Sequence, residues 1–62
     1  MNHAKIARPK VTITPADLTN LYHASCEHCA WTAGPTAKSH LQQVEAPLHR
    51  QAHRDGRVPV TR

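Results

Sequence analysis

Three observations predict a small metal-stabilised α+β fold, in which a short β-hairpin packs on one C-terminal α-helix between flexible basic termini. The chain has only 62 residues, so it buries too little apolar surface to offset the entropy of ordering itself. Cys26 and Cys29 are separated by two residues, and His49 and His53 by three. A metal ion bound by both pairs would supply the folding free energy that so small an apolar core cannot provide.

The two ends of the chain predict basic extensions on either side of a central domain. Residues 1–13 show no helical period, although Val11 and Ile13 are compatible with an edge strand. The boundaries that we expect are an arm over 1–13, a metal-bound domain over 14–54 and a tail over 55–62. The net charge of +4 with neutral histidines favours polyanionic partners, although ordinary solubility explains such a charge equally well.

The segment that begins at Thr14 has two interpretations. Thr14, Pro15 and Asp17 resemble a helix start, with a capping hydroxyl, a proline in the first turn and a carboxylate near the positive helix end. Such a helix would be short, because residues 21–25 read equally well as a strand that runs into Cys26.

The second half of the chain predicts a returning strand and then the helix. Residues 30–33 would form that strand, which Gly34 and Pro35 would end. Ser39 and Gln42 have the spacing of a capping box, so we expect the helix to begin at Ser39 after a loop over 34–38. A stripe spanning roughly 80° of the helical wheel marks its buried face, and it consists of Ala37, Leu41, Val44, Leu48 and Ala52.

Pro47 lies inside this helical pattern, where it removes one backbone hydrogen bond and crowds the carbonyl of Gln43. The apolar stripe keeps its phase across Pro47, which favours one bent helix. Two short helices are the alternative.

The cysteine and histidine pairs form the candidate metal site. A two-residue knuckle aims both sulfurs at one ion, and histidines four positions apart leave the same face of a helix. Two thiolates and two imidazoles complete a closed tetrahedron for one structural Zn²⁺, with no position for a reactive water. The set predicts a protein that is not an enzyme. The alternatives are a set that includes His40, and coincidence among six histidines.

Other residues have less specific interpretations. His28 points away from the converging sulfurs and is expected in solvent, whereas Trp31 is expected to be the main core side chain rather than a base-stacking platform. A thiol oxidoreductase based on Cys26 and Cys29 is disfavoured, because that chemistry uses a larger scaffold and leaves the histidines unexplained.

The motif Cys26-x2-Cys29 followed by His49-x3-His53 resembles a two-Cys two-His zinc finger of the strand-strand-helix type. With Trp31, the Gly-Pro turn and an Ala-rich helix, it is similar to short zinc-finger proteins of actinobacteria and their phages. Nineteen residues separate Cys29 from His49, whereas the familiar DNA-reading finger has about twelve. This longer gap implies a helix that begins later than Pro35. The resemblance itself supports the fold more than a particular function.

Nucleic-acid binding, to DNA rather than RNA, is the favoured functional hypothesis. Outward side chains near the front of the helix would contact bases and the basic termini would hold phosphates. The predicted contact residues are Lys5, Arg8, Lys10, Lys38, Gln42, Gln43, Arg50, Arg54 and Arg57. The alternative is an adaptor that binds a larger protein assembly, with purely structural zinc.

The sequence also predicts a cytoplasmic, reducing location. A disulfide between Cys26 and Cys29 would close a very small loop and remove little unfolded-state entropy. Residues 1–15 lack the apolar run of a secretion signal. No segment approaches the roughly 18 apolar residues that would span a bilayer. We expect no small-molecule substrate.

Overall fold

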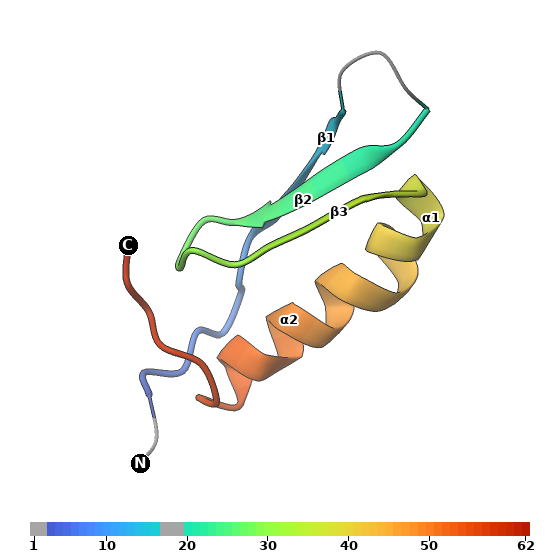
Figure 1. Cartoon of the computed structure of the whole chain (residues 1–62). Coiled ribbons are helices and arrows are strands. Elements are labelled where there is room, and N and C mark those ends of the chain that lie inside the picture. Colours follow the sequence, from blue (N-terminus) through green and yellow to red (C-terminus); the bar gives the residue numbers. More distant parts are fainter. Residues whose placement is uncertain (1–2, 17–19) are drawn as a thin grey trace.

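The structure is a computed structural model that describes residues 3–16 and 20–62. Three strands precede one helical segment near the C-terminus, which confirms the α+β class (Figure 1). The strands are β1 (Val11–Pro15), β2 (Tyr22–Cys26) and β3 (Thr32–Thr36). The helical segment comprises α1 (Lys38–His40), a π-helical turn η1 (Leu41–Glu45) and α2 (Ala46–Arg54).

The sheet is antiparallel with the order β1-β2-β3, one strand more than the predicted hairpin. The predicted helix start at Thr14 is wrong, because Thr14 and Pro15 pair with His23 and Tyr22 as part of β1. The strand interpretation of residues 21–25 is confirmed by β2. The domain boundary expected after residue 13 falls inside β1. The remainder of the predicted first helix, Asp17 and Leu18, lies outside the described residues.

Strand β3 passes through Gly34 and Pro35, where the sequence predicted a strand end and a loop over 34–38. Gly34 has φ +96° and a cis peptide bond to Pro35. A Cβ atom at Gly34 would lie 2.5 Å from the carbonyl oxygen of Tyr22, so the close pairing of β3 with β2 requires glycine there. Pro35 is tolerated because β3 is an edge strand.

The helix is continuous through Pro47, as the single-helix interpretation predicted. Its N-cap residue is Ala37, so the capping box expected at Ser39 is wrong. Immediately before Pro47, the amide of Ala46 donates to the carbonyl of Leu41 in the wider π-helical pattern. A π-helical turn interrupts the regular ladder of α-helical hydrogen bonds, and a proline can be accommodated at such an interruption.

The π turn changes which side chains face the sheet. One extra residue in a turn rotates the following helix by about 100°. Leu41 is fully buried, but Leu48 is 63% exposed and Val44 is 40% exposed, so the predicted apolar stripe is wrong beyond Leu41 and Ala52. Ala46 and the two histidines of α2 take the buried positions instead. The largest fully buried side chains are Leu41, His53 and Cys26, and the core therefore centres on the cysteine and histidine pairs.

Candidate metal centre

Two elements bring the four predicted ligands together. Cys26 ends β2 and Cys29 lies in the turn that follows, which we call the metal knuckle (residues 26–29), while His49 and His53 lie on successive turns of α2. All four are buried, and one ligand atom from each lies within 4.8 Å of the others. Among residues 3–16 and 20–62, these four side chains are the group that could hold a metal ion.

The distances between sulfur and nitrogen atoms fit one tetrahedral zinc ion. Cys26 Sγ lies 3.3 Å from His53 Nε2, and Cys29 Sγ lies 3.4 Å from His49 Nε2. Zinc bonds of about 2.3 Å to sulfur and about 2.0 Å to nitrogen separate tetrahedral S and N ligands by about 3.5 Å. Each close pair joins the metal knuckle to α2, so an ion at this position connects the two parts of the domain.

The protonation states of the imidazoles suit metal binding. Burial lowers the pKa of His49 and of His53 below the ordinary 6.5, and repulsion from a neighbouring histidine adds to the effect in each case. The neutral imidazole, which can coordinate a metal, is therefore favoured at neutral pH.

The thiol of Cys26 is in a different situation. Burial raises its pKa, while the hydrogen bond that Cys26 Sγ accepts from the amide of His28 at 3.3 Å opposes the rise. A zinc ion binds the thiolate and so releases the proton that burial retains. The amide of His28 then stabilises the resulting sulfur charge.

The surroundings of the two histidines also indicate a role in metal binding. The indole of Trp31 stacks on the imidazole of His49 and holds its orientation, so Trp31 packs against a ligand rather than at the centre of the core. Among the described residues, His53 Nδ1 is a buried polar atom without a hydrogen-bond partner. Burying such an atom costs about 1–3 kcal/mol, and metal binding at Nε2 would offset that cost.

Two further histidines lie outside the ligand set. His40 is exposed on α1, where its Nε2 lies 3.9 Å from Glu45 Oε1, and the predicted alternative set with His40 is not the one that the fold assembles. His28 is half-buried, and its Nε2 accepts a hydrogen bond from the amide of Lys10 at 3.1 Å. The expectation that His28 lies free in solvent is therefore wrong.

The N-terminal segment (residues 3–10) lies along the metal centre. Its first half contacts the end of α2, where the amide of His3 donates to the carbonyl of Gly56 and that of Ile6 to the carbonyl of His53. Its last residue contacts the metal knuckle, because the carbonyl of Lys10 accepts a hydrogen bond from the amide of Glu27. Lys5, Arg8 and Lys10 are thereby placed beside the metal site.

The C-terminal segment (residues 55–62) makes the corresponding contacts. The amide of Arg57 donates to the carbonyl of Ala52 in α2, and the amides of Thr61 and Arg62 donate to the carbonyl of His28. Figure 1 shows the two terminal segments, residues 3–10 and 55–62, on the side of the molecule where α2 ends.

The predicted nucleic-acid contacts thus divide into two groups. Lys38, Gln42 and Gln43 lie at the front of the helix, where the Lys38 amine is 5.4 Å from the centre of the Tyr22 ring. The other predicted residues lie on α2 or on the two terminal segments, which bond to α2 and to the metal knuckle. We call them, together with Arg62, the basic end: Lys5, Arg8, Lys10, Arg50, Arg54, Arg57 and Arg62. Arg62 is not among the predicted contact residues, although it belongs to the same basic tail.

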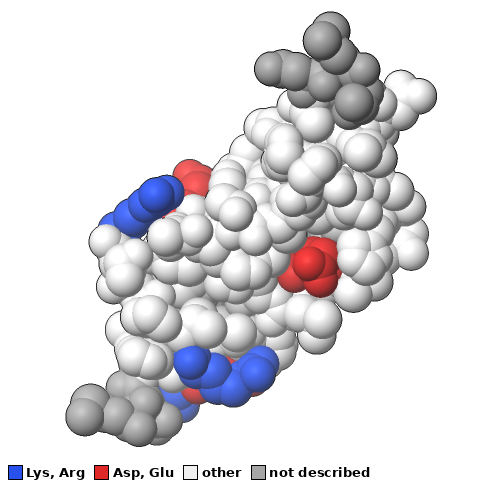
Figure 2. Space-filling view, in the orientation of Figure 1, with Lys and Arg blue, Asp and Glu red and all other residues white. Residues whose placement is uncertain are grey.

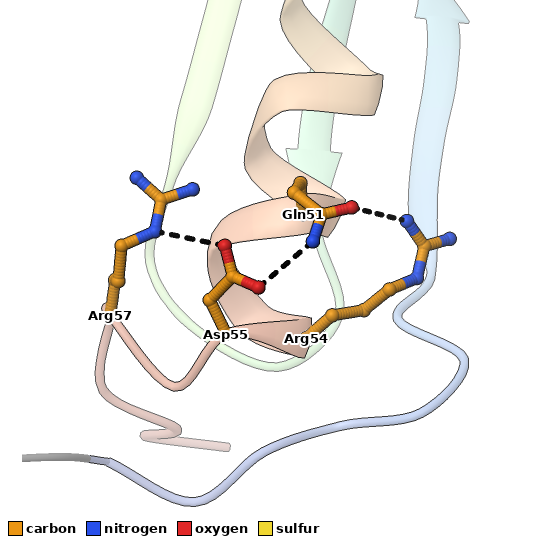
Figure 3. Close-up of polar contacts among 4 residues, drawn as sticks. All are labelled: Gln51, Arg54, Asp55 and Arg57. Atoms are coloured by element: carbon orange, nitrogen blue, oxygen red, sulfur yellow. Dashed lines mark hydrogen bonds and ion pairs between the residues drawn. The ribbon is translucent and has the colours of Figure 1, made fainter.

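Acidic side chains interrupt the basic end. On the face shown in Figure 2, Lys and Arg side chains form separate groups, each with an acidic residue close by. At the end of α2, Asp55 accepts hydrogen bonds from Arg57 at 3.3 Å and from Gln51 at 2.9 Å (Figure 3). Gln51 in turn accepts one from Arg54 at 3.4 Å. Asp55 therefore neutralises Arg57 in part, whereas Arg54 pairs with an uncharged amide.

The fold and the site define a small zinc-binding protein of the two-Cys two-His type, with a three-stranded sheet and one C-terminal helix. The chain matches none of the family models, curated proteins or solved structures with which it was compared. Both cysteines are free of disulfide bonds. Within residues 3–16 and 20–62, every helix is too short or too polar to cross a membrane.

Proposed function

We propose that this protein binds nucleic acid through the basic end, and that its zinc is structural rather than catalytic. The observation that supports this proposal most is the distribution of charge. Seven of the eight Lys and Arg residues of the chain belong to the basic end, and Lys38 is the eighth. Glu27 and Asp55 are the acidic residues that the structure places beside them. The basic end thus carries a net charge of +5.

A fixed group of cations favours a polyanion over single acidic groups, because each neutralised phosphate releases a condensed counterion. Duplex DNA carries one charge per about 1.7 Å of helix axis, so it offers more phosphates to a rigid surface than a single strand does. A duplex is therefore the form of nucleic acid that we propose, with DNA as the primary ligand and duplex RNA as the comparison.

The mode of binding that we propose differs from that of a base-reading finger. Gln42 and Gln43 belong to η1 and lie away from the basic end, and the gap of nineteen residues between Cys29 and His49 lengthens the helix on that side. Phosphate contacts position a protein without reading sequence. We therefore expect little dependence of affinity on base sequence.

The test is a titration of fluorescent DNA and RNA duplexes with zinc-loaded protein at several salt concentrations. The logarithm of the binding constant should fall linearly with the logarithm of salt concentration, by about 0.9 per phosphate contact. Arg54→Gln should weaken binding and reduce this slope, whereas Lys38→Gln, which removes the one cation outside the basic end, should do neither. Equal effects of the two substitutions, or no salt-dependent binding, would exclude the proposal.

The exposed apolar side chains of the helix favour a second candidate function. Leu48 is 63% exposed and Val44 is 40% exposed, which suits an adaptor that binds an apolar protein surface. A partner recovered from a lysate after nuclease treatment, and lost with Leu48→Ser but retained with Arg54→Gln, would support the adaptor function.

A further inference from the structure

Both terminal segments connect the two halves of the metal centre. The N-terminal segment bonds to the histidine-bearing helix through Ile6, whose amide lies 3.1 Å from the carbonyl oxygen of His53. The same segment bonds to the metal knuckle through Lys10. The carbonyl of Lys10 accepts a hydrogen bond from the amide of Glu27, and its amide donates one to His28 Nε2, both at 3.1 Å. It can make both sets of contacts only when the helix and the knuckle are as close as the metal site holds them.

The C-terminal segment makes the same kind of connection in the opposite direction. Near its start, the amide of Arg57 donates to the carbonyl of Ala52 in α2 at 2.9 Å. Near its end, the amide of Thr61 donates to the carbonyl of His28 in the metal knuckle at 2.8 Å. Five of the seven cations of the basic end are on the two segments, namely Lys5, Arg8, Lys10, Arg57 and Arg62.

We infer that zinc and nucleic acid bind to this protein cooperatively, because the terminal segments that carry most of the basic end are held in place only when the metal joins the knuckle to α2. This inference rests on the proposed nucleic-acid binding. By linkage, the factor by which zinc raises the affinity for nucleic acid equals the factor by which nucleic acid raises the affinity for zinc.

Net charge does not produce this coupling. Two cysteine thiols lose two protons when one Zn²⁺ binds, so the zinc-bound protein has the same net charge at neutral pH as the metal-free chain. What zinc changes is the conformational freedom of the basic segments, and a ligand that binds to already ordered segments loses less entropy.

Gly56 is the positioning residue that makes the inference testable. It has φ +69°, and a Cβ atom there would lie 2.6 Å from the carbonyl oxygen of His3 and 3.1 Å from Lys5 Cγ. Gly56→Ala should therefore displace the N-terminal segment from the end of α2. The substitution leaves the four ligands and all eight cations in the chain.

The experiment measures zinc affinity by competition with a chromophoric chelator, with and without a saturating short DNA duplex. For the unsubstituted protein, we expect the duplex to tighten zinc binding by about fivefold or more. Gly56→Ala should reduce that factor, and circular dichroism with zinc bound serves to show that the variant folds. Lys5→Gln with Arg8→Gln provides a second route to the same result without any change in the backbone.

A double-mutant cycle separates positioning from general destabilisation. If Gly56 acts by docking the N-terminal segment, the pair of glutamine substitutions should weaken DNA binding in the unsubstituted protein but have little effect in the Gly56→Ala background. Additive effects, or a chelator midpoint that DNA leaves unchanged while DNA still binds, would overturn the inference. Absence of salt-dependent DNA binding by the zinc-loaded protein would overturn the proposed function itself.

The docking of the segments can also be measured without nucleic acid. Amide hydrogen exchange at Ile6 and Thr61 should be slow in the zinc-loaded protein and fast after zinc removal, because both amides donate to residues of the metal centre. Fast exchange with zinc bound would contradict the inference whatever the result with DNA.

Discussion

The indole ring of Trp31 stacks on the imidazole of His49, with ring centroids 4.2 Å apart and planes 9° from parallel. Because groups that orient a ligand typically change metal affinity by about 10–100-fold, we expect Trp31→Ala to weaken zinc binding by about tenfold. Trp31→Phe retains an aromatic face and should restore most of the affinity. Chelator competition measures both variants, and an unchanged affinity in Trp31→Ala would show that the stacking does not orient His49.

Removing the metal should unfold the domain. Zinc binding at sites of this type contributes about 10–16 kcal/mol. Among the described residues, the buried apolar side chains other than the ligands are few, and Leu41 is the largest of them. Cys29→Ser and His53→Ala should abolish stoichiometric zinc binding and leave a largely unfolded far-ultraviolet circular dichroism spectrum. EDTA should produce the same spectrum from the unsubstituted protein, and a folded spectrum in EDTA would contradict this prediction.

Stability should decrease as the solution becomes acidic. The pKa values of His49 and His53 are lower in the folded protein than the ordinary 6.5. Below that pH the unfolded chain takes up protons that the folded protein excludes, so the contribution to stability is complete above about 6.5 and is lost as the pH falls further. Protons also compete with zinc for Cys26 and Cys29, which acts in the same direction.

The measurement is a series of denaturant titrations in zinc buffer from about pH 7.5 to about pH 5. His23→Gln is the control, since His23 is an exposed histidine on β2 outside the ligand set, and it should leave the pH dependence unchanged. Stability that rises on acidification would show that the buried imidazoles are not the groups that control it.

Asp55→Asn should strengthen DNA binding. Asp55 pairs with Arg57 at 3.3 Å on the exposed surface of the basic end (Figure 3), and its loss frees one cation and removes one repulsive charge. Exposed pairs of this kind are worth about 0.2–1 kcal/mol, so a gain in affinity between about 1.4-fold and about fivefold is expected. Glu45→Gln, on the helix away from the basic end, should have a smaller effect, and an equal gain would mean that only net charge matters.

The ligands could be predicted from the sequence because their arrangement is local. A two-residue spacing makes a knuckle and a three-residue spacing places two histidines on one helical face, whatever the surrounding fold. Strand β1 also had a local signal, the unbroken run of β-branched residues from Val11 to Thr14. The helix-start pattern at Thr14 and Pro15 competed with that signal, and pairing with β2 decided the outcome.

Two other features depend on tertiary structure and have no comparable signal in the sequence. The docking of both terminal segments uses backbone amides and carbonyls, which every residue except proline provides equally, so their sequence shows only basic charge. The π turn depends on how the helix lies against the sheet. It overrides the apolar stripe because burying His49 and His53 at the metal centre outweighs burying Leu48.

The altered phase of the helix leads to the last prediction, which compares two leucines. Leu41 is fully buried and Leu48 is 63% exposed, although both belong to the same stripe of a regular α-helix. Leu41→Ala should lower the free energy of unfolding of the zinc-loaded protein by about 2–5 kcal/mol, whereas Leu48→Ala should change it by less than about 0.5 kcal/mol. Denaturant titration of both variants at saturating zinc provides the comparison. Similar losses in the two variants would mean that the helix is regular through Pro47.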